Sequence, residues 1–402
     1  MKKRILTIQQ FYALMFLTKR IRAKIVDRYF KNKSKTQQLA GSLSSALEQL
    51  EDIPKDSGKY RLFLRDDMYI HLDLTYEIEE LRKDLYFLRH SQDDFQRFLE
   101  KLHPGFSEQI REGEHILKGM HFRTFITDRD GTVNNYCGRY KSSIQSIYNS
   151  IYLTRFATCC ARNSVILTSA PLDNVGLLDI SINPSNTLIY AGSKGREYID
   201  TNGNINRFPI EKEKQEKLDI LNRRLSQLVK KPDYEIYSLI GSGLQFKFGQ
   251  TTISRQDIYG TIPEDESRNF LMTVSDIVYA IDPGKEFFVI EDTGKDIEII
   301  LTIKRACNSH DPKDFDKGDG VAFLNRQLNL IMANGPNLIC GDTLSDIPMV
   351  SVSIENTADT WAVFVTDDNE LKQKVIAVCP NSFFVTQPDI LVSLLNNLSN
   401  RM

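Results

Sequence analysis

The spacing of hydrophobic residues changes along the chain, and a first region with its own pattern ends near residue 117. Apolar residues in this region recur every three or four positions, as in Leu81, Leu85 and Leu88, which is typical of amphipathic helices. Prolines and glycines interrupt the pattern between the helical stretches. We therefore expect a bundle of three or four helices over residues 1–117.

From His121 onward, short apolar runs replace the helical pattern, and each run ends directly in polar residues. The runs are Phe122–Ile126, Ser164–Leu167, Asn337–Cys340 and Trp361–Val365, with helical spacings between them. Buried strands that alternate with helices are typical of a parallel α/β sheet. Because ligands of such sheets bind beyond the carboxyl ends of the strands, we expect the functional site at these run ends.

Between the second and third runs lies a region of different texture, from about residue 195 to 305. It contains three predicted strands and two predicted helices, Leu244–Phe248, Phe287–Ile290, Ile297–Leu301, Glu211–Val229 and Glu266–Ala280. We interpret this region as an α+β domain inserted into the sheet domain. We predict a bundle over residues 1–117 and a first part of the sheet domain over 118–194. The insertion then covers 195–305, and the second part of the sheet domain covers 306–402.

The composition, with 41% hydrophobic and 26% charged residues among 402, is that of an ordinary globular protein and excludes a disordered or collagen-like chain. The net charge of −2 argues against a nucleic-acid-binding protein. Residues 1–35 nevertheless carry eleven Lys and Arg and a single acid, Asp27. This end either contacts an acidic partner or an anionic membrane surface, or forms a solvated helix face.

Six cysteines are too few for a disulfide scaffold, and none forms a C-x-x-C pair of the kind found in zinc and redox sites. We expect a reducing compartment and hence a cytoplasmic location. Met1–Arg4 resembles the start of a signal peptide, but Gln9 and Gln10 interrupt the apolar stretch that follows. Since no run of 18 apolar residues exists, we expect neither a cleaved signal nor a transmembrane helix.

The first candidate for chemistry is the string Asp128-Arg129-Asp130-Gly131-Thr132, which directly follows an apolar run. Of two carboxylates one residue apart, one can attack a phosphorus atom and form an aspartyl-phosphate. The other can protonate the leaving oxygen and later activate water. Gly131 permits the sharp turn that this requires. The alternative is a strand-to-helix loop in which an aspartate caps the helix.

A second acidic pair, Asp342 and Asp346, follows another apolar run at the same predicted sheet edge. Four acids crowded together are unfavourable unless a cation neutralises them. Carboxylate oxygens select magnesium, with water and a substrate phosphate completing the octahedron. The sequence therefore predicts a Mg²⁺ site, and the alternative is a solvated acidic loop.

Two further groups suit phosphate chemistry. Lys317, at a predicted helix start, can hold the aspartyl nucleophile and a phosphoryl oxygen, although a lone lysine is more often a surface residue. Thr168 and Ser169 follow the second run, where a hydroxyl can donate to phosphate. The competing interpretation of both hydroxyls is a helix cap.

In chain order these groups are Asp-x-Asp, a hydroxyl, Lys and Gly-Asp-x-x-x-Asp, which resembles the haloacid dehalogenase superfamily of phosphotransferases. The resemblance implies an α/β fold with a Rossmann-like parallel-sheet core, an inserted type-two α+β cap and here an N-terminal helical bundle. The resemblance implies that Asp128 is the nucleophile and Asp130 the general acid and base. It also implies that Thr168 binds the phosphate and that Lys317 orients it. The implied magnesium ligands are the side chains of Asp128, Asp342 and Asp346 and the backbone carbonyl of Asp130.

Longer strings resemble trehalose-6-phosphate phosphatases, particularly the nematode type, which also carries an N-terminal helical domain. They are Ile126–Thr132, Thr154–Ala157, Gly192–Glu197, Gly241–Lys247, Lys317–Val321 and Leu338–Val350. The resemblance implies hydrolysis of trehalose 6-phosphate to trehalose and phosphate. A disaccharide phosphate needs fixed donors and acceptors, and the expected substrate contacts are Ser169, Arg196, Glu197, Gln245, Lys247 and Glu298.

Three departures from the family pattern leave the sugar open. Arg129 stands where relatives often carry a hydrophobic or aromatic residue, Thr168–Pro171 differs from the common Ser-Gly-Arg, and Ile300 replaces a frequent arginine. Sucrose phosphate and glucosylglycerol phosphate stay alternative substrates, and a phosphomutase is an alternative reaction. From another class of function, residues 1–117 form an interaction module that binds a protein partner or mediates self-association.

Overall fold

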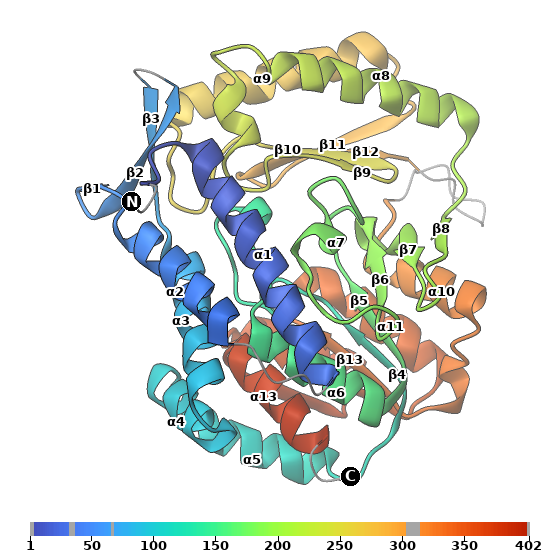
Figure 1. Ribbon diagram of the computed structural model, residues 1–402. Helices are drawn as coiled ribbons and strands as arrows, with labels where there is room; N and C mark the ends of the chain where they lie inside the picture. The colour runs from blue at the N-terminus through green and yellow to red at the C-terminus, as the bar shows by residue number, and fades with distance from the viewer. Residues whose placement is uncertain (1–3, 32–36, 66–67, 303–313, 400–402) are drawn as a thin grey trace.

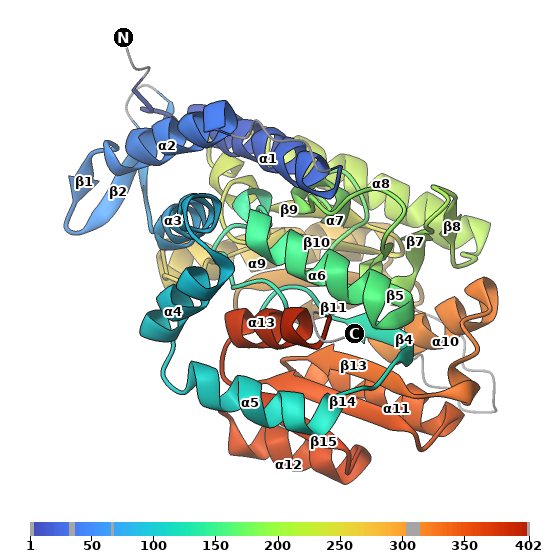
Figure 2. The same cartoon turned by 60° about the horizontal axis from the view of Figure 1, so that its bottom comes forward.

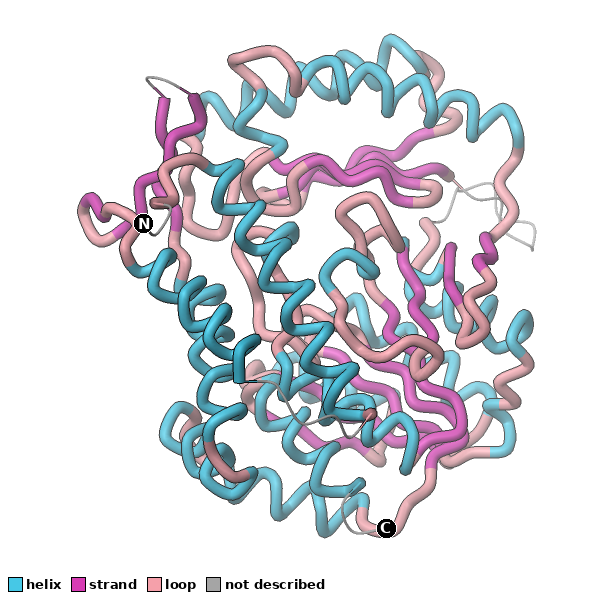
Figure 3. Tube along the Cα trace, in the orientation of Figure 1, coloured by secondary structure: helices cyan, strands magenta, loops and turns pink. Residues whose placement is uncertain are grey.

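The computed structural model describes residues 4–31, 37–65, 68–302 and 314–399. They form three units, which Figure 1 shows as a bundle (blue and cyan), a sheet domain and a cap (yellow-green) above the sheet domain. The same trace coloured by secondary structure separates the strands of the cap from those of the sheet domain (Figure 3). This arrangement confirms the fold class expected from the sequence.

The N-terminal unit contains more than the predicted helices. Its helices are α1 (Ile8–Phe30), α2 (Gln37–Glu51), α3 (Thr75–Arg89), α4 (Gln92–Leu102) and α5 (Phe106–Leu117). Three antiparallel strands, β1 (Lys55–Asp56), β2 (Lys59–Arg65) and β3 (Met68–Leu72), stand between α2 and α3. The sequence analysis missed this sheet, although Tyr60, Leu62 and Leu64 of β2 are buried in strict alternation, the period of a strand.

The sheet domain is built on an eight-stranded sheet in the order β15-β14-β13-β4-β5-β6-β7-β8. The four predicted strands are present and parallel as β4 (Phe122–Thr127), β5 (Ala161–Leu167), β13 (Asn337–Gly341) and β14 (Thr360–Val365). The remaining strands are β6 (Ile189–Gly192), β7 (Glu197–Ile199), β8 (Ile205–Arg207) and β15 (Ser382–Val385). Strand β7 pairs antiparallel with β6, and β8 pairs antiparallel with β7. Both strands thus belong to the sheet domain, although the cap was expected to start at residue 195.

Helices cover both faces of this sheet. They are α6 (Ile147–Cys159), α7 (Leu177–Ile180), α10 (Lys317–Leu328), α11 (Ile347–Asn356), α12 (Asn369–Val378) and α13 (Pro388–Ser399). On one face α6 and α13 lie between the sheet and the bundle (Figure 2), and their buried side chains form one hydrophobic core with those of the bundle. On the other face α10, α11 and α12 form a separate core. The bundle therefore shares a core with the sheet domain rather than hanging from it by a linker.

The cap is a four-stranded antiparallel sheet in the order β11-β12-β10-β9, with two helices on its outer side (Figure 1). Its elements are α8 (Lys212–Leu228), β9 (Leu244–Lys247), β10 (Gln250–Ser254), α9 (Glu264–Ile281), β11 (Phe288–Asp292) and β12 (Asp296–Leu301). Ile253, Ile297 and Ile299 belong to the hydrophobic core that joins the sheet to α8 and α9. The other face is polar, because Gln245, Thr252 and Glu298 pair across three strands and point to the same side.

Short 3-10 turns complete the described elements: η1 (Tyr140–Ser142), η2 (Ser193–Gly195), η3 (Glu235–Ser238), η4 (Met332–Asn334) and η5 (Leu344–Asp346). Among the described helices, none is both long enough and apolar enough to cross a membrane. The cysteines within the described residues are unpaired, whereas Cys307 lies outside those residues.

A buried ionic cluster joins the bundle to the sheet domain. The ammonium group of Lys83 lies 2.8 Å from Glu80 and 2.7 Å from Asp389, and His103 lies 2.6 Å from Asp389. Asn135 donates to Asp389 at 2.9 Å. Burial alone would raise the pKa of Asp389, but Lys83 and His103 outweigh it and hold this pKa well below its ordinary value. The charged form of Asp389 is therefore the one that the fold stabilises.

We predict that Asp389→Asn lowers the free energy of unfolding at pH 7 by about 3 kcal/mol, because it leaves a buried lysine poorly compensated. Since the folded pKa of Asp389 is depressed, the wild-type advantage is present at neutral pH and shrinks as the pH falls below about 4. Urea denaturation at a series of pH values measures both effects. The control is Glu370→Gln, which removes an exposed ion pair with Lys374 and should cost less than about 0.5 kcal/mol. Equal losses in the two variants would contradict a stabilising role for the cluster.

Candidate active site

Three carboxylates meet at one edge of the sheet. Asp128 follows β4, Asp342 follows β13, and Asp346 is the last residue of the turn η5. Ligand oxygens of all three lie within 4.8 Å of one another. They meet because β4 and β13 are neighbouring parallel strands, with Thr127 in register with Cys340. The structure thus brings together the first acid of one motif and both acids of the other.

The electrostatics of this cluster favour a bound cation. Burial raises the pKa of Asp128 well above its ordinary value, and Asp346 and Asp342 raise it further, against the opposing charge of Lys317. Burial, followed by repulsion from Asp346, raises the pKa of Asp342 to about 6. Oxygen ligands with an excess of negative charge fit a hard divalent cation. These three side chains could therefore hold a metal ion.

Lys317 supplies the fixed positive charge of the site. Its ammonium group lies 2.6 Å from Asp128 and 2.5 Å from Asp346 and is buried. It occupies the first turn of α10, whose start is fixed by a reciprocal cap between Asp316 and Asp319. Burial lowers the pKa of Lys317, but the two carboxylates outweigh this and raise it above its ordinary value. The interpretation of Lys317 as an ordinary surface lysine is therefore wrong.

The side chain of Asp130 is not part of the cluster of Asp128, Asp342 and Asp346. It contacts the guanidinium of Arg129 and accepts a 3.2 Å hydrogen bond from Ser143. It also lines a cavity of about 260 Å³ whose other wall is formed by cap residues, among them Gly241, Ser242 and Asp296. A ligand bound between the domains would meet this carboxyl group. The expected metal contact of Asp130 through its backbone carbonyl stays a prediction.

Thr168 and Ser169 lie at the same edge, directly after β5. Thr168 is buried, and its hydroxyl accepts a hydrogen bond of 3.3 Å from the amide of Ala170. The next helix, α7, begins eight residues later with Gly176 at its N-cap, so the helix-cap interpretation of both hydroxyls is wrong. Both positions stay candidates for phosphate contacts.

Three residues expected to bind sugar lie on the polar face of the cap sheet. Lys247 lies 3.4 Å from Glu298, and Gln245 is buried beside them with its amide nitrogen unpaired among the described residues. Burial raises the pKa of Glu298, but Lys247 and then Lys194 outweigh it and lower the net value. Lys194 of the sheet domain lies 4.0 Å from Glu298 and thus bridges the two domains. The sequence analysis quoted the string that contains Lys194 but did not select this residue.

Arg196 and Glu197 have different surroundings from those expected. Arg196 donates to the carbonyl oxygen of Gly249 at 2.7 Å and lies over the ring of Phe315, where it ties the cap to the sheet domain. One oxygen of Glu197 accepts from the amide of Leu172 and the hydroxyl of Ser193 at 3.1 and 2.8 Å. Because buried protein contacts already occupy these polar atoms, a direct sugar contact is not supported for either residue.

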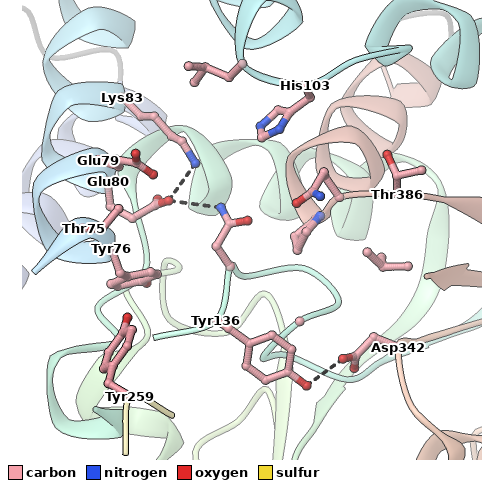
Figure 4. A pocket seen from close by; sticks show the side chains of 16 residues that line it. Thr75, Tyr76, Glu79, Glu80, Lys83, His103, Tyr136, Tyr259, Asp342 and Thr386 are labelled. Atoms are coloured by element: carbon pink, nitrogen blue, oxygen red, sulfur yellow. Dashed lines mark hydrogen bonds and ion pairs between the residues drawn. The ribbon is translucent and has the colours of Figure 1, made fainter. Parts of the chain in front are cut away.

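Two neighbours of Asp342 were not selected as site residues, although Thr132 belongs to the first motif string. Thr132 donates to one oxygen of Asp342 at 3.0 Å, and the hydroxyl of Tyr136 donates to the other at 2.7 Å. Figure 4 shows this second contact on the wall of a cavity of about 500 Å³ between α3 and the sheet domain. The backbone at Gly131 has φ of +89°, and a Cβ atom there would lie 2.2 Å from Asp342. The same Cβ atom would lie 2.4 Å from the ring of Tyr136, so only glycine fits between Tyr136 and Asp342.

A buried aspartate after a strand, a buried lysine and a second acidic pair share one sheet edge, with a cap inserted above it. This arrangement, together with the sheet order, resembles that expected for the haloacid dehalogenase superfamily. A family model described as "Trehalose-6-phosphate phosphatase, C-terminal" matches residues 125–391, and the "N-terminal helical bundle domain" of the same family matches residues 7–104. The chain belongs to the trehalose-6-phosphate phosphatase family.

Individual proteins of known sequence or structure are similar to this chain. A protein of Aphelenchoides avenae named alpha,alpha-trehalose-phosphate synthase [UDP-forming] 2 is 32% identical over 96% of this chain, which spans 31% of that relative's length. A trehalose-phosphatase of Brugia malayi is 28% identical over 98% of this chain and 86% of its own length. Among solved structures, the C-terminal domain of the trehalose-6-phosphate phosphatase of C. albicans superposes with a TM-score of 0.46 at 14% identity, over 73% of this chain and 96% of that one.

We predict that Gly131→Ala lowers the affinity for Mn²⁺ or Mg²⁺ at least about tenfold, because the new methyl group displaces Asp342. The matched control is Gly203→Ala, where φ is +87° but nothing lies within 4 Å of the added Cβ. The control should lose about 1 kcal/mol of stability and no cation affinity. Isothermal titration calorimetry measures the affinities, and equal affinities in the two variants would refute the predicted displacement.

Proposed function

We propose that this chain is a magnesium-dependent phosphatase that hydrolyses trehalose 6-phosphate to trehalose and phosphate. The observation that carries the proposal is the position of Lys317 between Asp128 and Asp346, beneath the polar face of the cap, in a chain of the trehalose-6-phosphate phosphatase family. Asp128, Asp342, Asp346 and the carbonyl of Asp130 would hold Mg²⁺, which when bound supplies positive charge to the phosphoryl oxygens.

The reaction proceeds in two displacements. An oxygen of Asp128 attacks phosphorus, the bond between phosphorus and the sugar oxygen breaks, and Asp130 donates its proton to that oxygen. Trehalose leaves, and Asp130 then takes a proton from water as the water oxygen attacks the aspartyl-phosphate. Phosphate is released and Asp128 is restored. Lys317 holds Asp128 in place and offsets negative charge on the transferred group, while Thr168 donates to a phosphoryl oxygen.

The cap face supports a neutral polyhydroxyl leaving group. The amide of Gln245 can donate to a sugar hydroxyl, and the Glu298 carboxylate can accept from one. Lys247 and Lys194 hold this carboxylate between them. Buried groups of this kind discriminate strongly between substrates, because a sugar without the matching hydroxyl leaves them unpaired. The names of relatives that act as trehalose-phosphatases favour trehalose over sucrose phosphate and glucosylglycerol phosphate. Phosphate release across a panel of these compounds tests the choice, and a preference for another sugar would overturn it.

We predict that Asp128→Asn lowers kcat for trehalose 6-phosphate by at least about a thousandfold, because an amide cannot form the aspartyl-phosphate. The matched control is Asp367→Asn, since Asp367 also follows a threonine at the end of a parallel strand but is exposed. The control should keep wild-type turnover. Removal of metal with EDTA should abolish activity, and added Mg²⁺ should restore it. Substantial turnover by Asp128→Asn would rule out this nucleophile.

We further predict that Glu298→Gln raises KM for trehalose 6-phosphate about 10–100-fold, the equivalent of one hydrogen bond to a charged group. The kcat/KM for p-nitrophenyl phosphate should change less than about twofold, because this compound carries no sugar. The control is Lys212→Met, a residue 91% exposed on the outer helix of the cap. Parallel losses on both substrates would mean that Glu298 supports the cap and does not bind sugar.

A further inference from the structure

One face of helix α3 in the N-terminal bundle packs on the loop that follows the catalytic motif. We call residues 131–146, between Asp130 and the start of α6, the motif loop. Four buried residues of α3, one or two turns apart, contact the motif loop or the first amide of α6: Tyr76, Glu77, Glu80 and Asp84. Figure 4 shows Tyr76 and Glu80 facing the chain that carries Tyr136. The loop next to the catalytic acids is therefore shaped by a helix about fifty residues earlier in the sequence.

A continuous chain of hydrogen bonds runs from α3 to Asp130. The side-chain Nδ2 of Asn134 lies 3.1 Å from the hydroxyl of Tyr76 and 3.2 Å from the hydroxyl of Ser143. It also lies 2.8 Å from the carbonyl oxygen of Asn135, so its two hydrogens are shared among three acceptors. Ser143 donates to Oδ1 of Asp130 at 3.2 Å. Tyr76, Asn134 and Ser143 are each at most 9% exposed. These three side chains are thus largely shielded from bulk solvent, although Tyr76 and Ser143 each border a cavity.

Arg129 belongs to the same network. Its guanidinium donates to the Ser143 hydroxyl at 3.0 Å and to the Ser143 carbonyl oxygen, and it also contacts Oδ1 of Asp130. This explains the departure at position 129: the arginine is buried and links the acid to the motif loop. Both donors to Asp130 use Oδ1, which leaves Oδ2 for a proton transfer. The position of Ser143 therefore decides where the carboxyl group of Asp130 points.

A second set of contacts holds Ser143 from the other side. One oxygen of Glu77 accepts from Arg139 at 2.7 Å and from the Ser142 hydroxyl at 2.6 Å. Tyr76 also donates to the carbonyl oxygen of Ile144 at 3.1 Å. The residues on both sides of Ser143 are thus bound to α3.

We propose that α3 is a positioning element for the general acid, acting on Asp130 through Tyr76, Asn134, Ser143 and Arg129. The inference rests on the proposed function, since it requires Asp130 to protonate a sugar oxygen. The bundle is then part of the catalytic unit rather than an attached interaction module. Tyr76 and Ser143 are positioning residues, because they reach the substrate only through Asp130.

The test compares two leaving groups. A sugar alkoxide must be protonated as it departs, whereas p-nitrophenolate is stable enough to leave without a proton. The ratio kcat/KM reports the steps up to departure of the leaving group, so it isolates the acid role of Asp130 from its later role with water. Tyr76→Phe, which keeps the ring, should lower kcat/KM for trehalose 6-phosphate about tenfold. It should change kcat/KM for p-nitrophenyl phosphate less than about twofold.

Three reference variants calibrate this comparison. Asp130→Asn should show the same selective loss at about a hundredfold or more, the usual size of a general-acid effect. Ser143→Ala, a small change within the motif loop, repeats the test if Tyr76→Phe folds poorly. Tyr86→Phe is the matched control, because Tyr86 lies on the same helix and stacks on Phe98 of α4 at 4.4 Å. It should leave both substrates unchanged.

The possible outcomes are distinct. Equal losses on both substrates, or no loss in folded Tyr76→Phe and Ser143→Ala, would overturn the positioning role. If wild-type protein turns over a different sugar phosphate, the proposed substrate fails, and the same leaving-group comparison is made with that sugar. If wild-type protein turns over p-nitrophenyl phosphate and no sugar phosphate, the proposed function fails and the inference falls with it. A selective loss that matches Asp130→Asn in kind supports the positioning role.

Discussion

The repulsion among three carboxylates, two of them buried, is compensated by one lysine and is the constraint on which the rest of the structure depends. Asp128, Asp342 and Asp346 stay together because neighbouring parallel strands end at one edge, and Lys317 lies between them at the first turn of α10. Such a cluster opposes folding unless the surrounding structure holds it and positive charge offsets it. Gly131, whose missing side chain leaves room for Asp342, shows how closely the backbone is fitted around these groups.

The bundle and the sheet domain form one packed unit. Their hydrophobic residues form one continuous core, and the ionic cluster of Lys83 and Asp389 closes the contact near the motif loop. Shared burial makes the two units cooperative, because neither can separate without exposing apolar surface and unpaired charges. The cap has its own hydrophobic core. Polar contacts join it to the sheet domain, among them that of Arg196 and the ion pair of Lys194 with Glu298. This division suits the proposed role of the cap, which is to bind a sugar above the sheet edge.

The parts of the fold that the sequence analysis missed share a physical cause. Strand β10 is buried along its whole length but is composed of Gln250, Thr251, Thr252, Ile253 and Ser254, so no apolar run marks it. Strands β7 and β8 are three residues each, too short for periodicity to show. In the small N-terminal sheet the alternation of Tyr60, Leu62 and Leu64 was present but lay within a region of helical spacing. Pairing with neighbouring strands, rather than an apolar pattern of their own, made β7, β8 and β10 strands, and β8 is exposed along its whole length.

The sequence by itself determined the four strands β4, β5, β13 and β14 and the polar residues that follow them, because apolar runs are local and parallel strands place their carboxyl ends at one edge. It could not determine which polar residues around that edge face a ligand. Arg196 and Glu197 were expected to bind sugar, yet they form buried contacts with the protein. Arg129 was only a departure from the family, and Tyr76 had no signal. Their partners are set by packing between segments far apart in the chain, and only the tertiary structure brings those segments within hydrogen-bonding distance.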